Sequence, residues 1–197
     1  MSTAAPALVS TCGQVIPLAV DRWHAPADAV ERALLATVDD AVLDVGCGPG
    51  RIVAELARQG RVALGVDTSP AAVAATRRRG AAVLRRSAFD PLPGEGRWGS
   101  VLLLDGNVGI GGDPVALLAR CAGLLRPGGQ VVVEVEPPGV AARSLTVRLE
   151  SAATRSRWFP WAQVGTDDVA DLAVRAGLRP LGRSEAGGRW FARAVRP

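Results

Sequence analysis

The segment with the clearest chemical potential is DVGCGPG, residues 44–50, an acid followed by three glycines at alternate positions. Glycine has no side chain and accepts positive φ, so a turn of this composition lets the backbone approach a ligand closely. The acid beside the turn suits a ligand that carries positive charge. A pyrophosphate ligand is disfavoured, because the dinucleotide fingerprint G-x-G-x-x-G would need a glycine at Arg51.

Two further acids follow short apolar segments and could reach the same turn. Asp67 ends the segment 61–67 and lies 21 residues after Gly46, while Asp105 follows the segment 101–104. A carboxylate at the tip of a second strand can accept hydrogen bonds from both vicinal hydroxyls of a ribose. The alternatives are that Asp67 only caps a helix and that Asp105 only forms a turn.

Three side chains are candidates for a general base, namely His24, Asp105 and Glu136. His24 is the only histidine, and its ordinary pKa lies near neutrality. Glu136 ends an alternating Glu-Val-Glu segment whose two acids share one face of a strand, so we expect it at the mouth of the site. A purely structural role is the alternative for His24.

Tryptophans outside these segments are candidates for binding a substrate. They are Trp23, Trp158, Trp161 and Trp190. Trp158 and Trp161, with Phe159 between them, could wall a pocket for an aromatic or a cationic substrate. The alternative is ordinary packing in the core.

Alternating strands and helices position these residues. Apolar strands are expected at 41–45, 61–67, 81–85, 101–104 and 130–136, and helices at 27–37, 51–59, 71–79 and 113–125. The uninterrupted apolar run at 101–104 indicates a central strand. This order predicts an α/β fold whose ligands bind at the carboxyl ends of the strands.

The glycine segment, Asp67 and a third motif together resemble the class I (Rossmann-like) S-adenosylmethionine-dependent methyltransferases, of the small bacterial type that acts on small molecules. The third motif is a helix ending in leucines, a Pro127-Gly128-Gly129 turn and a β-branched strand. The resemblance covers about residues 41–136. It implies a three-layer, doubly wound, mostly parallel seven-stranded sheet with a closing C-terminal hairpin. S-adenosylmethionine would be the cofactor and S-adenosylhomocysteine the product.

The resemblance also implies which residues hold the cofactor, with the glycine turn cradling its amino acid end. They are Asp44, Gly46, Cys47, Gly48, Gly50, Asp67, Thr68, Ser87, Ala88, Phe89, Asp105, Gly106 and Asn107. The chain departs from the family where an acid often binds the adenine amine, because Ser87 stands at that position. The adenine contact therefore stays open between Ser87, the Ala88 backbone, Phe89 and Asp90.

The last third of the chain differs from a minimal family member. Segments 145–150 and 157–164 predict a β ribbon within an insertion at about 141–164, after the fifth strand. Segments 178–184 and 189–195 would form the closing hairpin, after a helix over 166–176. We expect residues 1–20 to be a flexible N-terminal arm and residues 21–197 to form a single cofactor-binding domain.

Composition excludes several other classes. A length of 197 residues with 48% hydrophobic residues predicts one globular α/β domain. The formal net charge of +4 arises from arginine alone, since the chain has no lysine. Arg77–Arg79 and Arg85–Arg86 are interpreted first as a helix end and a strand start, and second as a phosphate-binding patch. The 3 cysteines have no metal-like spacing, which fits a reducing cytoplasm, and neither a metal site, a signal peptide nor a membrane span is expected.

The implied activity is methyl transfer to an oxygen or nitrogen atom of a small, aromatic or otherwise hydrophobic molecule. The chain has neither the Asn-Pro-Pro-aromatic segment of enzymes that methylate exocyclic amines of nucleic acids nor a Pro-Cys pair for attack on a pyrimidine. We expect a monomer or homodimer without nucleic-acid or membrane partners. An RNA- or protein-modifying methyltransferase and a cofactor-binding protein without this activity are the alternatives.

Overall fold

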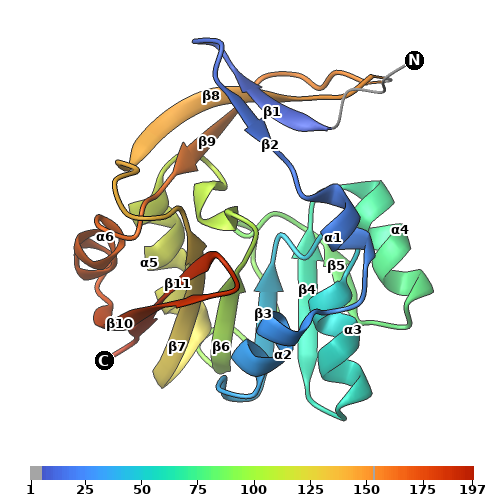
Figure 1. Cartoon of the computed structure of the whole chain (residues 1–197). Helices are drawn as coiled ribbons and strands as arrows, with labels where there is room; N and C mark the ends of the chain where they lie inside the picture. The colour runs from blue at the N-terminus through green and yellow to red at the C-terminus, as the bar shows by residue number, and fades with distance from the viewer. Residues whose placement is uncertain (1–5, 153) are drawn as a thin grey trace.

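The computed structural model describes residues 6–152 and 154–197, and its centre is a seven-stranded sheet with helices on both faces (Figure 1). The strand order is β10-β11-β7-β6-β3-β4-β5. These strands are β3 (Val42–Val45), β4 (Ala63–Asp67), β5 (Val83–Arg85), β6 (Trp98–Leu103), β7 (Leu125–Val135), β10 (Arg179–Ala186) and β11 (Arg189–Val195). Strands β3 to β7 pair in parallel, whereas β10 and β11 form an antiparallel hairpin against β7.

The helices cover the sheet in two groups. They are α1 (Val20–His24), α2 (Ala29–Leu35), α3 (Arg51–Arg58), α4 (Pro70–Arg78), α5 (Pro114–Leu124) and α6 (Val169–Arg175), with a 3-10 turn η1 (Asn107–Gly109). Successive strand residues point to opposite faces, so Leu102 packs with α2 and α3 while Val101 and Leu103 pack with α5 and α6. This arrangement confirms the predicted doubly wound α/β fold and its closing hairpin.

A second sheet lies above the carboxyl ends of the parallel strands (Figure 1). Its order is β2-β1-β8-β9, with strands β1 (Ala7–Ser10), β2 (Val15–Pro17), β8 (Arg143–Glu150) and β9 (Phe159–Gln163). The pairing of β8 with β9 agrees with the predicted ribbon after the fifth strand. The small sheet thus roofs the edge at which a doubly wound sheet binds its ligands.

The N-terminal segment differs from the flexible arm expected over residues 1–20. Strand β1 pairs with β2 and with β8, joining Ala7 to Glu150, and α1 begins at Val20. Short strands of three or four residues give no clear periodicity, and the partner β8 lies far along the chain, so local sequence did not reveal this pairing. Residues 1–5 lie outside the described part of the chain.

Two element boundaries also differ from expectation. Strand β6 begins at Trp98 rather than at 101, because Trp98 and Ser100 already pair with β7 around Gly99. The helix expected at 27–37 is the shorter α2, which begins with a capping box in which the side chains of Asp28 and Glu31 each accept the other's backbone N–H, and α1 is an additional helix before it. In the described part of the chain, no helix is both long enough and apolar enough to cross a bilayer.

Candidate active site

The glycine turn follows β3 and leads into α3, as the sequence predicts. Gly46, Gly48 and Gly50 all have positive φ, at 71°, 53° and 80°. A Cβ at Gly46 would lie 2.6 Å from Asn107 Nδ2, and one at Gly50 would overlap the side chain of Thr76. Glycine is therefore required at both positions by conformation and by space.

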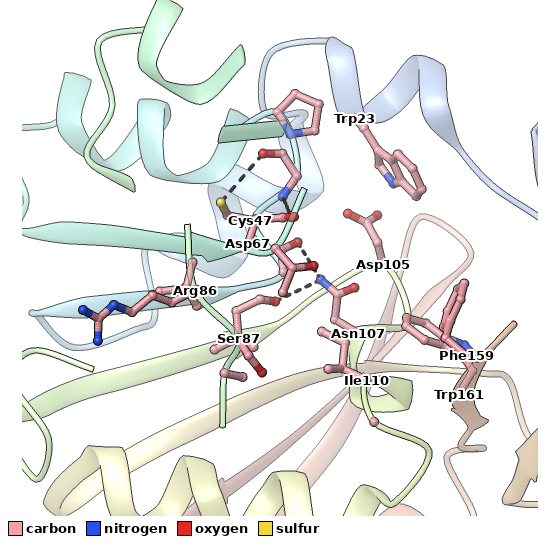
Figure 2. Close-up of a pocket in the computed structure, with 18 of the residues that line it drawn as sticks. Trp23, Cys47, Asp67, Arg86, Ser87, Asp105, Asn107, Ile110, Phe159 and Trp161 are labelled. Carbon is pink, nitrogen blue, oxygen red and sulfur yellow. Dashed lines mark hydrogen bonds between the residues drawn. The ribbon is translucent and has the colours of Figure 1, made fainter. Parts of the chain in front are cut away.

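A cavity of about 300 Å³ opens over this turn, between the carboxyl ends of β3 and β4 and the roof strand β9 (Figure 2). Many of the residues expected to hold a cofactor line it. They are Gly46, Cys47, Gly48, Asp67, Thr68, Ser87, Ala88, Asp105 and Asn107. A Cβ built at Gly48 would contact no other atom, so the backbone at Gly48 is open to the cavity.

Asp67 is held at the rim of the cavity by two backbone donors. Gly48 N–H donates to its Oδ2 at 2.9 Å, and Ser69 N–H donates to its Oδ1 at 2.8 Å. Each carboxylate oxygen keeps a second acceptor position. The orientation is that required to accept hydrogen bonds from two neighbouring hydroxyls.

Four of the expected cofactor residues do not line this cavity. Asp44 is buried beneath it, Gly50 is packed against α4, and Phe89 is 46% exposed on its outer side. Gly106 lines a neighbouring cavity instead. Of the residues expected to contact an adenine, Ser87 and Ala88 line the cavity wall, and the Asp90 carboxylate accepts a hydrogen bond from Ser87 N–H.

Burial changes the acid–base properties of two side chains at the turn. Desolvation raises the pKa of Asp44 to about 7, against the opposing effect of the Arg51 charge. Desolvation also raises the pKa of the Cys47 thiol, and the nearby carboxylates Asp44 and Asp67 add to this effect. Cys47 is therefore a neutral wall residue and not a nucleophile.

A second cavity, of about 180 Å³, adjoins the first. Trp23, Asp105 and Trp161 line both cavities, and Glu136 lines the second. Figure 2 shows Trp23, Asp105 and Trp161 together on the side of the first cavity opposite Asp67. The two cavities thus meet along a shared wall of one carboxylate and two indoles.

The three candidate bases occupy different environments. Asp105 has a φ of 56° and is fixed by Arg22 at 2.6 Å and by Arg51 at 2.8 Å. His24 is exposed and lines neither cavity, because it lies in the last turn of α1, away from the wall that Trp23 forms. Glu136, directly after β7, is the candidate that faces a cavity without an arginine partner in the described structure.

The candidate tryptophans also differ in whether they line a cavity. Trp161 and Phe159 line the first cavity and contact each other edge to face, with ring centroids 6.3 Å apart. Trp158 lies directly before β9 and lines neither cavity, because its exposed ring packs against the Arg148 guanidinium at 4.7 Å. Trp190 is a partly buried residue of β11 that packs against the core. Trp158 and Trp190 are thus not brought to the site.

A buried charge network beneath the site was not predicted from the sequence. Arg51 donates to Glu31 at 2.6 Å, and Arg189 donates to Glu134 through two nitrogens at 2.9 and 2.7 Å. Glu134 in turn accepts the backbone N–H of Asp105 at 2.7 Å. The spacing of Asp28 and Glu31 is typical of a capping box, and Arg51 directly follows the glycine turn, so both features are visible in the sequence. The contact between Arg51 and Glu31 depends on the tertiary fold and could not be predicted.

The pKa of Arg51 shows why this network is charged. Burial acts to lower the pKa of its guanidinium, but the hydrogen bond that it donates to Glu31 and the charges of Asp105 and Glu31 outweigh burial and raise it. No group of three or more metal-ligating side chains occurs among the described residues. The site therefore offers carboxylates, guanidiniums, indoles and backbone groups.

A doubly wound parallel sheet with a glycine turn after its first strand and an acid at the tip of the next defines a fold that binds nucleoside ligands at the strand ends. Residues 42–129 match the family described as "Methyltransferase domain". This match confirms the resemblance of the sequence motifs to the class I S-adenosylmethionine-dependent methyltransferases.

Curated relatives carry the name ubiquinone biosynthesis O-methyltransferase. The chain is 29% identical over 153 residues to the one from Cereibacter sphaeroides, covering 72% of this chain and 61% of that protein. It is 28% identical over 153 residues to the one from Roseobacter denitrificans, with the same coverage of 72% and 61%. The chain thus spans about three fifths of the length of these relatives.

Solved structures share the fold at low identity. An S-adenosylmethionine-dependent methyltransferase from Bacteroides fragilis, in complex with S-adenosyl-L-homocysteine, matches with a TM-score of 0.78 and 19% identity over 99% of this chain and 89% of that one. A sugar N-methyltransferase from a Streptoalloteichus species matches with a TM-score of 0.62 and 22% identity, covering 85% of this chain and 83% of that one.

Proposed function

We propose that this chain is a methyltransferase that uses S-adenosylmethionine to methylate an oxygen or nitrogen atom of a small molecule. The observation that carries the proposal is the pair of cavities that meet at Trp23, Asp105 and Trp161. A donor and an acceptor in these cavities would lie next to each other, as an in-line displacement requires. The family match and the O- and N-methyltransferase relatives support the same activity.

The residues of the larger cavity fit the proposed cofactor. The open backbone at Gly48 leaves room for its amino acid end, and the fixed carboxylate of Asp67 suits its ribose hydroxyls. Ser87 and Ala88 form the wall on which an adenine would lie. The acids near the turn complement a ligand with an ammonium and a sulfonium group.

The chain contributes to methyl transfer mainly by positioning and by excluding water. When bound, S-adenosylmethionine supplies a methyl group on a positively charged sulfur. Trp161 and Phe159 in the roof strand cover the cavity, and the roof packs tightly on η1, where a Cβ at Gly109 would overlap the carbonyl oxygen of Ala162. This close contact holds the roof over the reacting atoms and restricts solvent.

Calorimetry with S-adenosylmethionine and S-adenosylhomocysteine tests the cofactor assignment. We expect the wild type and the Asp171→Ala control, an exposed acid in α6, to bind alike. Asp67→Ala should bind about 10-fold to 100-fold more weakly, since hydrogen bonds to a charged group contribute about 1.5–3 kcal/mol. Equal binding by wild type and Asp67→Ala would show that the assignment of Asp67 is wrong.

A screen of small-molecule acceptors, with release of S-adenosylhomocysteine as the readout, tests the activity itself. Turnover on small metabolites supports the proposal, and cofactor binding without turnover on any acceptor class would favour a non-catalytic binding protein.

We also propose that the chain acts as a monomer or homodimer in the cytoplasm, without a nucleic-acid partner. Its three cysteines are free thiols, which supports a reducing compartment. Nucleic-acid binding that weakens steeply with salt would contradict the proposal.

A further inference from the structure

Two residues that line the smaller cavity carry buried hydrogen-bond donors that the protein does not satisfy. Arg22 and Trp23, both from α1, line it on one side, and strand β9 lines the other. The indole nitrogen Nε1 of Trp23 and Nε of Arg22 are buried and have no hydrogen-bond partner among the described residues. Buried donors without partners are costly, so a ligand that places an oxygen atom there would recover this free energy.

The same cavity contains one carboxylate that no guanidinium neutralises. Three acids line it: Asp105, Glu134 and Glu136. Asp105 is paired with Arg22 and Arg51, and Glu134 is paired with Arg189. In the described structure Glu136 has no ion pair, and its nearest side-chain donor is Gln163 Nε2 at 3.4 Å. Glu136 is thus free to bind a cationic group.

The charge of the whole cluster favours a cation over an anion. Its guanidiniums are Arg22, Arg51 and Arg189, whereas its carboxylates are Asp28, Glu31, Asp105, Glu134 and Glu136. A phenolate or carboxylate ligand would meet this excess of acids, while an ammonium would be attracted by it. The indole faces of Trp23 and Trp161 at the shared wall add a favourable surface for a cation.

We propose that the smaller cavity binds the methyl acceptor and that this acceptor is a hydroxylated amine, a small molecule with an amino group and a nearby hydroxyl. This inference rests on the proposed methyltransferase function. The amino group binds to Glu136, and the hydroxyl oxygen accepts hydrogen bonds from Trp23 Nε1 and Arg22 Nε. Trp161 covers the carbon skeleton between these two ends.

Glu136 also has a chemical role in this scheme, because an ammonium has no lone pair to attack with. The ammonium gives one proton to the Glu136 carboxylate, which is half-exposed and returns the proton to solvent. The nitrogen lone pair then forms the N–C bond to the methyl carbon while the S–C bond breaks. The products are the methylated ammonium and S-adenosylhomocysteine, so charge and atoms balance.

The first test compares acceptors of similar size in the methyl-transfer assay. The panel contains amino sugars and amino cyclitols, the same polyols with hydroxyl in place of the amine, cyclohexylamine, and catechol. We expect S-adenosylhomocysteine release with hydroxylated amines and at least 10-fold less with every other class. Turnover of catechol alone, or cofactor binding without turnover of any hydroxylated amine, would overturn the inference. A wild-type protein that does not bind S-adenosylmethionine would instead refute the proposed function.

The second test assigns the two ends of the acceptor to their residues. Glu136→Gln should raise KM for the amine by about 10-fold or more, and Trp23→Phe should raise KM for the hydroxylated amine but not for cyclohexylamine. Glu136→Gln should bind S-adenosylhomocysteine with wild-type affinity, because Glu136 lines only the smaller cavity, which separates acceptor binding from damage to the cofactor cavity. Glu150→Gln is the control, because this carboxylate lies in β8 and pairs with Arg148 and Arg155 away from both cavities. Unchanged KM values in Glu136→Gln would contradict the assignment.

Discussion

Replacing Arg51 by methionine should destabilise the fold strongly, because it removes the partner of a fully buried acid. The Arg51 side chain is 3% exposed and that of Glu31 is 0% exposed, with Nη2 and Oε1 2.6 Å apart. Removing one partner of a buried ion pair costs about 3–5 kcal/mol, since the remaining charge is left uncompensated. Arg189 still reaches Glu31 at 3.2 Å, so we expect about 3 kcal/mol.

Urea unfolding of purified protein measures this change. Arg58→Met is the matched control, because Arg58 lies on the same helix and pairs with Glu55 at the surface, so it should leave the unfolding midpoint nearly unchanged. The double variant Arg51→Met/Glu31→Gln should recover part of the loss, since it removes the unpaired charge as well. If Arg51→Met lowers the midpoint no more than Arg58→Met does, the reasoning about the buried network is wrong.

Three further substitutions test other parts of the structure. Folding raises the pKa of Asp44 from 3.8 to about 7, so the native state binds more protons than the unfolded state in this window and its stability falls as pH rises through it. Asp44→Asn should remove this decrease in stability, which amounts to about 4 kcal/mol at most. Urea unfolding of the variant and the wild type between pH 5 and 8 measures the effect, and an equal pH dependence of the two proteins would contradict the prediction. Gly109→Ala should displace strand β9 from η1, because the added Cβ would overlap the Ala162 carbonyl oxygen. We expect a loss of about 1–3 kcal/mol in stability by urea unfolding and weaker cofactor binding by calorimetry. Gly123→Ala, at an exposed position of α5 with open space around it, should instead stabilise by up to about 1 kcal/mol, and a loss of stability there would refute the helix-propensity argument.

The fold was predictable where its signals are local. The glycine turn, the apolar strands and the helices that follow them each depend on a few neighbouring residues, and their positions agree with the sequence apart from element boundaries such as the start of β6. The pairing of β1 with β8 was not predictable, because it joins two ends of the chain through backbone hydrogen bonds that leave no motif. The sequence therefore predicted the pairing of β8 with β9 in the small sheet, but not the pairing of β1 with β8.

In the candidate site, too, the features set by local sequence were predictable and those set by tertiary contacts were not. The residues of the first cavity follow from one turn and three strand ends, so sequence spacing found most of them. Arg22, Arg51 and Arg189 come from α1, α3 and β11, and only the tertiary structure brings them to the same acids. Trp158 was assigned to the site for its type alone, whereas only Trp161, within β9, lines the cavities, and Trp158, just before β9, packs against Arg148.

The fixed conformation of Asp105 decides which carboxylate is free for chemistry. A non-glycine residue at a φ of 56° is uncommon, and here both carboxylate oxygens and the backbone N–H of Asp105 are held, by Arg22, Arg51 and Glu134 respectively. The two guanidinium contacts fix the Asp105 carboxylate in place, whereas Glu136 has no ion pair in the described structure. Asp105 therefore joins α1 to α3 beneath the shared wall through Arg22 and Arg51, and the proposed role of binding or deprotonating an acceptor falls to Glu136.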